Sequence, residues 1–236
     1  MKKCFYGAFF GGSFLFSTDM LLNVHSHFPG KKGEYVIQSL WEHYEKVRET
    51  GLFSLGVHPR YIVEDASGQL EQLRIWAGHS SVMAIGECGL DRRYPTDLKK
   101  QSDVFFAQVL LAAEFRKPLV IHCVRAWEEV FHLLGRASFS FPVIFHGFNK
   151  GPSIARRIIE SGYYLSIGQW IEKARIRELL KEIPLERLFL ETDAVAVPIE
   201  SIYEMAAASY HMPLPSFSTQ IMNNGLRVFG EKLLSV

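Results

Sequence analysis

Short apolar runs recur along the chain from residue 20 onward, and each is followed by a more polar segment. The eight runs are Met20–His25, Tyr35–Ser39, Leu52–Val57, Val82–Gly86, Leu119–His122, Val143–His146, Tyr163–Ile167 and Leu188–Leu190. They lack the regular polar alternation of half-exposed strands, so they are typical of strands buried on both faces of a parallel sheet. The pattern therefore predicts eight buried strands.

Segments with helical periodicity lie between most of these runs. Phe105, Val109 and Ala112, for example, are spaced so that they share one face of a helix. The predicted helices are Ala66–Ala77, Leu98–Phe115, Trp127–Leu134, Ser153–Ile159, Ile171–Ile183, Ile199–Ser209 and Ser216–Phe229. Eight strands alternating with helices over 20–236 predict a compact α/β fold, a (β/α)8 barrel of the TIM type.

The joint between the first two strands is too short for a helix. Only a Pro-Gly-Lys-Lys-Gly loop separates His27 from the strand that begins near Tyr35. A parallel crossover usually needs a dozen residues or more, so this joint departs from the barrel pattern. We expect the first helix to be missing. With no linker or internal repeat in the sequence, we expect one domain over 20–236.

Residues 1–19 form a separate N-terminal extension in this interpretation. Lys2 and Lys3 precede the 13-residue apolar stretch Cys4–Phe16, as in a secretory signal. However, Ser17–Asp19 offers no A-x-A cleavage pattern, and Met20 opens directly into the first predicted strand. We expect an extension foreign to the fold, with translation starting at Met20. A genuine signal or anchor is the alternative.

Composition narrows the class of protein. The chain has 26 Lys and Arg against 25 Asp and Glu, a net charge of +1. This excludes a globally basic nucleic-acid binder and leaves a local basic groove possible. Three cysteines are too few for a disulfide scaffold, and no apolar run reaches the roughly 20 residues that span a bilayer. We therefore expect a cytoplasmic monomer without a membrane partner.

Side chains that bind metals stand at the ends of six of the eight predicted strands. They are His25, His27, His58, Glu87, Asp91, His122, His146 and Asp193. The carboxyl ends of barrel strands meet at one face, and alternate residues of a strand point to the same side. Taken singly, His58 is an ordinary polar residue, Glu87 an ion-pair partner and Asp193 a helix cap. Together, four imidazoles and two carboxylates are enough for two divalent metals that activate a water molecule.

The combination resembles the TatD family of metal-dependent deoxyribonucleases among the amidohydrolase-type barrels. The matching pieces are Val24–His27, Gly56–Pro59, Ala84–Asp91, Pro118–Arg125, Phe145–Phe148 and Leu190–Asp193. The resemblance extends from Met20 to the segment Asn224–Phe229. It implies hydrolysis of phosphodiester bonds in DNA, with single strands as the expected substrate. It also implies two divalent metal ions, with magnesium, manganese and zinc left open.

The resemblance also implies a role for each matching residue. One metal would be held by His25, His27, Glu87 and Asp193, and the other by Glu87, His122 and His146. Glu87 would bridge both ions, and Asp193 would orient or deprotonate the attacking water. Arg125 would bind a substrate phosphate, and His58 would line the substrate pocket. Arg60 and Asp91 are counted with the substrate-binding residues, and Asp91 would support its loop or contact a metal ligand from behind.

The sequence departs from the family at two places. Asn23 stands where the family usually has Asp and brings no charge, which bears on metal affinity. Ala194–Ala196 replaces the usual Ser-Pro-Tyr in a loop that shapes the substrate cleft, so substrate preference is open. Hydrolysis of another ester or amide, such as an aminoacyl ester on tRNA, is therefore an alternative. A metal-binding protein without activity is a second.

The basic residues that follow strands four and six are candidates for a cationic rim: Arg92, Arg93, Lys99, Lys100 and Lys150, with Arg156 and Arg157 inside a predicted helix. Three aromatic residues are candidates for base stacking: Tyr61, Tyr94 and Trp170.

Overall fold

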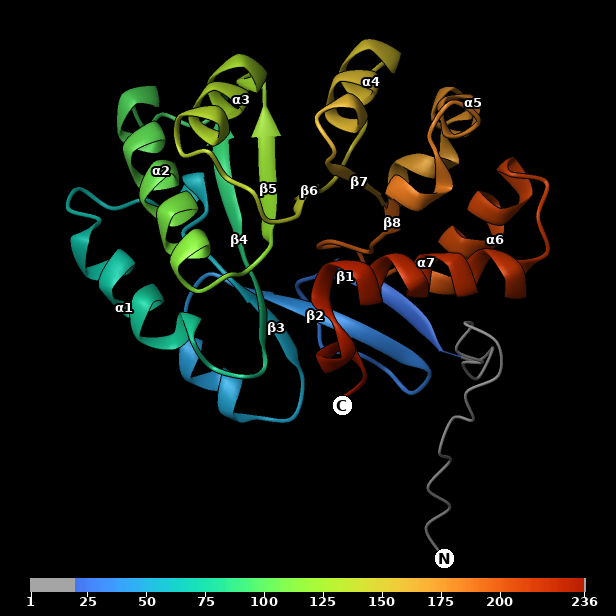
Figure 1. The fold of residues 1–236 in the computed structure, drawn as a ribbon, viewed down its shortest axis with the longest axis horizontal. Coiled ribbons are helices and arrows are strands. Elements are labelled where there is room, and N and C mark those ends of the chain that lie inside the picture. Colours follow the sequence, from blue (N-terminus) through green and yellow to red (C-terminus); the bar gives the residue numbers. More distant parts are fainter. Residues whose placement is uncertain (1–19, 236) are drawn as a thin grey trace, which may run out of the picture.

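A computed structural model describes residues 20–235 as eight parallel strands wound into a nearly closed barrel (Figure 1). The strands pair in sequence order. They are β1 (Leu21–Ser26), β2 (Glu34–Leu40), β3 (Leu52–Leu55), β4 (Val82–Asp91), β5 (Leu119–Val124), β6 (Val143–Phe145), β7 (Tyr164–Ile167) and β8 (Leu188–Leu190). The TIM-barrel prediction is confirmed. The predictions for 1–19 lie outside the described residues.

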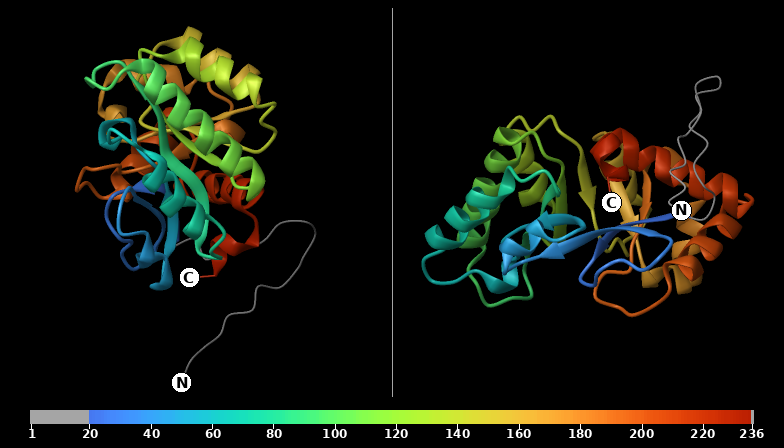
Figure 2. Two further views of the ribbon diagram at one scale, coloured as in Figure 1. Left: turned by 90° about the vertical axis from the view of Figure 1, so that its left-hand side faces the viewer. Right: turned by 90° about the horizontal axis from the view of Figure 1, so that it is seen from below.

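The helices lie on the outside of the strands. The α-helices are α1 (Ser67–Ala77), α2 (Leu98–Glu114), α3 (Trp127–Arg136), α4 (Pro152–Glu160), α5 (Ala174–Leu180), α6 (Ile199–Ser209) and α7 (Leu214–Phe229). Figure 2 shows α1 to α3 on one side of the strands and α6 and α7 on the other. The predicted helix Ile171–Ile183 is divided into a short 3-10 helix, Gln169–Glu172, and α5.

The crossover from β1 to β2 contains no helix, as the short joint predicts. Residues 27–33 return the chain to the start of β1, where the Leu21 amide donates to the Gly33 carbonyl at 2.9 Å. At about 3.3 Å per residue, seven extended residues reach about 23 Å, which exceeds the length of a six-residue strand. An extended loop can therefore complete a parallel crossover here. Between β1 and α1, the only helices of the described chain are two 3-10 helices, Tyr44–Arg48 and Pro59–Tyr61.

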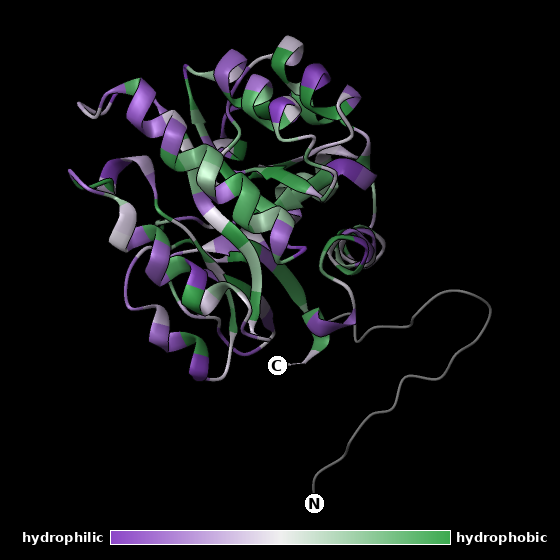
Figure 3. Ribbon diagram, turned by 60° about the vertical axis from the view of Figure 1, so that its left-hand side comes forward, coloured by the Kyte–Doolittle hydropathy of each residue, from purple (hydrophilic) through white to green (hydrophobic). Residues whose placement is uncertain are grey.

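Burial on both faces is what the strands share. Every residue of β1 and of β4 is buried, and Figure 3 shows the hydrophobic residues concentrated along the strands and the inner faces of the helices. This arrangement explains the unbroken apolar runs of the sequence. The ionisable side chains that enter the barrel gather toward the carboxyl ends of the strands.

The seam between β1 and β8 is closed by single contacts instead of a strand ladder. Near the carboxyl end, the Asp193 amide donates to the His25 carbonyl and the His27 amide donates to the Asp193 carbonyl, both at 3.0 Å. The Asn23 side chain donates to the Thr192 hydroxyl at 2.8 Å and accepts from the Thr192 amide at 3.1 Å. Asn23 thus holds the seam and does not contact the predicted metal ligands.

Farther down the seam, a helix side chain replaces the missing neighbour strand. The Tyr203 hydroxyl, on α6, donates to the Leu22 carbonyl at 2.8 Å and accepts from the Leu22 amide at 3.1 Å. Tyr203 is fully buried. One phenol therefore satisfies both backbone groups of an edge residue.

Replacing Tyr203 with phenylalanine is expected to destabilise the protein. Tyr203→Phe leaves the buried amide and carbonyl of Leu22 unpaired, which costs about 1–3 kcal/mol. Thermal unfolding should show a Tm several degrees lower. Tyr163→Phe is the matched control, because Tyr163 is half-buried and its hydroxyl makes no hydrogen bond within 20–235. Equal Tm shifts for both variants would contradict this role of the Tyr203 hydroxyl.

Candidate active site

Glu87 lies at the centre of a cluster of imidazoles at the carboxyl end of the strands. It is only 7% exposed. Its two oxygens face different groups of residues: Oε2 faces β1, and Oε1 faces the ends of β3, β5 and β6. One carboxylate is thus shared by two clusters.

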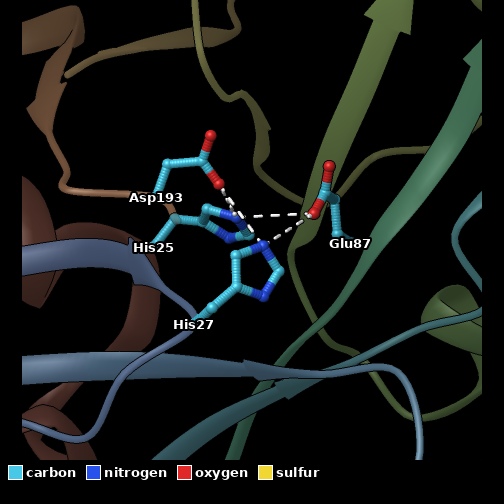
Figure 4. A group of neighbouring side chains, drawn as sticks. All are labelled: His25, His27, Glu87 and Asp193. Atoms are coloured by element: carbon cyan, nitrogen blue, oxygen red, sulfur yellow. Dashed lines mark ion pairs between the residues drawn. The ribbon is translucent and has the colours of Figure 1, made fainter. Parts of the chain in front are cut away.

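The first cluster consists of His25, His27, Glu87 and Asp193 (Figure 4). The Nε2 atoms of His25 and His27 lie 3.4 and 3.3 Å from Asp193 Oδ1. The same two atoms lie 3.5 and 3.6 Å from Glu87 Oε2. Figure 4 shows both rings between the two carboxylates. Four potential ligand atoms therefore surround one small volume.

The second cluster gathers around the other oxygen of Glu87. His146 Nε2 lies 2.7 Å and His122 Nδ1 lies 2.8 Å from Oε1. His58 Nε2 lies 3.2 Å from the same oxygen. The sequence prediction placed His58 in the substrate pocket, and the structure brings it within reach of the metal cluster as well.

Close approach of β4 and β5 makes this arrangement possible. A Cβ atom at Gly89 would lie 2.0 Å from the His122 carbonyl oxygen, so only glycine fits there. The β4–β5 register also shifts between Ile85 and Cys88. The two strands can therefore place Glu87 and His122 against each other.

Opposite charges hold these groups in ionised form. Burial opposes charge on His25, but Asp193 and Glu87 outweigh it and raise the pKa of His25 to about 9. Burial would raise the pKa of Glu87, yet the surrounding imidazoles, His146 foremost, hold it well below its usual value. The Asp193 pKa is likewise lowered against burial by His25 and His27. For His58 burial dominates, and its pKa is lowered.

Two further carboxylates support the cluster from behind. Asp91 Oδ2 lies 2.9 Å from His122 Nε2, and Arg93 binds the same carboxylate at 2.6 Å. Glu191 Oε1 accepts from the Gly147 amide at 2.6 Å and lies 3.6 Å from His146 Nδ1. Carboxylates in this position fix the ring orientation and tautomer of ligand histidines. Asp91, predicted on the substrate side, is fully buried behind His122.

Two cavities open onto the cluster from opposite sides. The smaller, about 220 Å³, is lined by Arg93, Lys150, Trp127 and Trp170 among others. The larger, about 420 Å³, is lined by Phe28, Trp41, Tyr61 and Tyr94 together with Arg60. His122, His146 and Asp193 line both. The structure thus brings six predicted residues to the site: Arg60, Tyr61, Tyr94, Trp170, Arg93 and Lys150. The other rim candidates are not among the residues that line either cavity: Arg92, Lys99, Lys100, Arg156 and Arg157.

Arg125 does not join them. It is exposed, with a left-handed backbone (φ 56°) directly after β5, and it is not among the residues that line either cavity. Trp41 and Phe28 were not recognised from the sequence. Trp41 directly follows β2, so the rule that strand ends face the site would have identified it.

The donor set fits divalent metals. Among the described residues, Nδ1 and Nε2 of His25 and Nδ1 of His27 are buried without hydrogen-bond partners. Ligands about 2.05 Å from a tetrahedral ion lie about 3.3 Å apart, close to the 3.3–3.6 Å between imidazole and carboxylate in the first cluster. An unpaired imidazole nitrogen facing two carboxylates is what an ion would satisfy. No described helix is long and apolar enough to cross a membrane.

Comparison with known proteins yields one family. The profile described as "TatD related DNase" matches residues 17–230. The "3'-5' ssDNA/RNA exonuclease TatD" of Cronobacter sakazakii is 38% identical over 146 residues, 59% of this chain and 55% of the relative. An uncharacterised metal-dependent hydrolase of Haemophilus influenzae is 32% identical over 157 residues, 62% and 60% of the two chains. The chain thus spans 55–60% of the length of these curated relatives.

Solved structures share the fold. The TatD homologue YjjV of Escherichia coli superposes with a TM-score of 0.78 at 20% identity, covering 90% of this chain and 99% of the other. A TatD family hydrolase of Entamoeba histolytica gives a TM-score of 0.77 at 17% identity, covering 89% and 98%. Almost the whole length of both structures is matched by this barrel.

Metal binding by the first cluster is expected to strengthen as pH rises. Because the pKa of His25 is raised to about 9 without metal, an ion must displace its proton at neutral pH. Apparent affinity for zinc or manganese should increase from pH 6 to pH 9 by up to about tenfold per pH unit for each proton released. Calorimetry in buffers of different ionisation enthalpy counts those protons.

His43 provides the control for this measurement. It is exposed and pairs only with Glu45. His25→Gln should reduce the number of protons released, and His43→Gln should not. Proton release that is the same at pH 6 and pH 9 would contradict the assignment of His25 as a metal ligand.

Proposed function

Because the chain belongs to the TatD related DNase family, we propose that it is a metal-dependent nuclease that degrades single-stranded DNA from an end. The observation that carries this proposal is the shared Glu87 carboxylate between two imidazole clusters, with cationic side chains in the cavities on either side. Relatives named 3'-5' ssDNA/RNA exonuclease support the direction from the 3′ end. Both DNA and RNA strands are then candidate substrates.

Phosphate binding is supported by the charges around the cluster. Arg93 and Lys150 line the smaller cavity, and Arg60 lines the larger. Cations on both sides suit a chain of phosphates that passes the cluster, and Lys and Arg supply most of the affinity for such a chain. A small neutral ester or amide has no charge for these side chains to bind. Phosphodiester hydrolysis is therefore favoured over hydrolysis of small neutral esters or amides.

We propose a pair of divalent ions, magnesium, manganese or zinc, at the two clusters. His25, His27, Glu87 and Asp193 would hold one ion, and Glu87, His122 and His146 the other, with His58 within reach of the second. Bound ions would lower the pKa of water and neutralise charge on the phosphate.

Proton transfer is the proposed task of Asp193. Its side chain is 35% exposed and lines both cavities, and its Oδ1 lies 3.4 and 3.3 Å from Nε2 of His25 and His27. Its low pKa keeps it ionised at neutral pH, so it can accept a hydrogen bond from water and orient it. As the more exposed of the carboxylates in the first cluster, it would also take the proton of that water. Asp91 holds His122 in place, Glu191 lies 3.6 Å from His146 Nδ1, and Glu87 is shared by both clusters.

Two buried cysteines bear on the compartment in which we propose that the protein works. Cys88 and Cys123 are buried free thiols, which suits a reducing compartment such as the cytoplasm. We propose a monomer, because Glu87 and the histidines around it form both clusters without needing a residue of a second copy.

Removal of the Glu87 charge is expected to abolish nuclease activity. Glu87→Gln keeps the shape but removes the anion shared by both clusters, so hydrolysis of end-labelled single-stranded DNA should fall by more than about 100-fold. Activity should require a divalent ion and stop with a chelator. The control is Glu128→Gln, because Glu128 is exposed and pairs only with Arg157. Metal-bound wild-type protein that leaves the DNA intact would refute the proposed function.

Asp193→Asn is expected to separate catalysis from metal binding. Asn adopts the left-handed backbone of this position (φ 54°) readily, so the fold should persist. Loss of the proton acceptor should lower kcat by about 10²–10⁴-fold. Metal content per chain, measured by atomic emission, should change little because three other ligands remain. A variant with near-normal kcat would assign proton transfer elsewhere.

A further inference from the structure

The larger of the two cavities beside Glu87 is walled by aromatic side chains. We propose that this aromatic pocket, formed by Phe28, Trp41, Tyr61 and Tyr94, binds the terminal nucleobase of the substrate strand by stacking and so selects chain ends. This inference rests on the proposed nuclease function. The four aromatic residues would determine the preference for strand ends, and Trp41 is the central one.

Trp41 forms the wall nearest to the metal cluster. Its ring stacks on Tyr61 with centroids 5.5 Å apart and planes 18° from parallel. It also meets His27 edge-on, with ring centroids 5.3 Å apart. A base that stacks in this pocket therefore lies next to a predicted metal ligand. The base in the pocket and the phosphate at the cluster can then belong to the same nucleotide.

The aromatic walls are open to solvent. Phe28 is 49% exposed and Tyr61 is 39% exposed. Trp41 and Tyr94 are partly exposed. Aromatic side chains that meet around a cavity offer flat apolar surface that is not used for packing within the barrel. Such surface stacks any base, because every base has a π-face.

The floor of the pocket carries an unused polar group. Ser39, on β2, is 1% exposed and lines the pocket, and its hydroxyl has no hydrogen-bond partner. A buried hydroxyl without a partner costs free energy unless a ligand satisfies it. Nucleobases combine an apolar face with a polar edge, so a base between the aromatic walls can bond to Ser39 with its edge.

Size and charge distinguish the two cavities. About 420 Å³ is within the range of pockets that hold small organic ligands, and it suits one nucleotide. Arg60 lines this pocket, with its guanidinium 5.8 Å from the Tyr61 ring. It can there bind the 5′ phosphate of the terminal nucleotide. The smaller cavity, with Arg93 and Lys150, suits the continuing phosphate backbone. A strand lying across the cluster in this way places its last phosphodiester bond at Glu87.

The test compares two single-stranded oligonucleotides that differ only at the 3′-terminal residue. One ends in a normal nucleotide, and the other ends in a stable tetrahydrofuran residue without a base. Wild-type protein should prefer the first by about 5- to 140-fold in kcat/KM, the equivalent of about 1–3 kcal/mol for one stacked base. Trp41→Ala should bring this ratio close to one, and Trp41→Phe should retain most of it.

Trp76→Ala serves as the matched control. Trp76 is a partly buried tryptophan on α1 that packs against Arg48 and is not among the residues lining either cavity. It should leave the ratio unchanged. Equal kcat/KM of the wild type for both oligonucleotides would overturn the proposal. So would a Trp41→Ala variant that slows both by one factor, which marks a structural role. If Trp41→Ala does not fold, Tyr61→Ala supplies the same comparison.

A binding measurement separates this inference from the proposed function. Deoxyadenosine 5′-monophosphate should quench the fluorescence of wild-type protein more than that of Trp41→Phe, and 2-deoxyribose 5-phosphate should quench neither. Quenching without DNA degradation would support the pocket and refute the nuclease. Degradation without this difference in quenching would support the nuclease and refute the pocket. Absence of both would refute both.

Discussion

Burial of the Glu87 carboxylate is the constraint on which the site depends. An ionised carboxylate in a barrel mouth costs several kcal/mol unless it is paired, and here imidazoles from β1, β5 and β6 and from the segment after β3 surround it. To bring them within reach, β4 and β5 must approach so closely that Gly89 has no room for a side chain. The spacing of β4 and β5, the pairing of the Glu87 charge and the position of both clusters therefore depend on one another.

Much of this arrangement could be predicted from the sequence. Buried strands read as apolar runs, and polar residues that end them face one side, so the residues around Glu87 were identified without coordinates. The rule failed where strands lose their alternation. Asp91 lies four residues after Glu87, yet the irregular stretch of β4 at Gly89 (φ 139°) precedes it, and its side chain lies behind His122. Arg125 follows β5 in a left-handed conformation that no sequence pattern announces.

Residues in loops were the hardest to predict, because their direction depends on how the loop packs. Trp41 and Phe28 follow β2 and β1, where connections without an α-helix bring them to the cavity beside the cluster. The absence of the first helix therefore affects the shape of the site. It leaves short, extended connections whose aromatic side chains shape one cavity, whereas the helical half of the barrel supplies Arg93 and Lys150 to the other. The two sides of the active site differ because the two halves of the barrel are built differently.

Asp193 belongs both to the seam of the barrel and to the first cluster. Its amide and carbonyl bond to β1, and its carboxylate faces the histidines of the same strand. An ion held by His25, His27 and Asp193 would link residues at the ends of the first and last strands. By mass action, such an ion would stabilise the folded chain by RT ln(1 + [L]/Kd). The free energy of unfolding would then depend on the concentration of the metal.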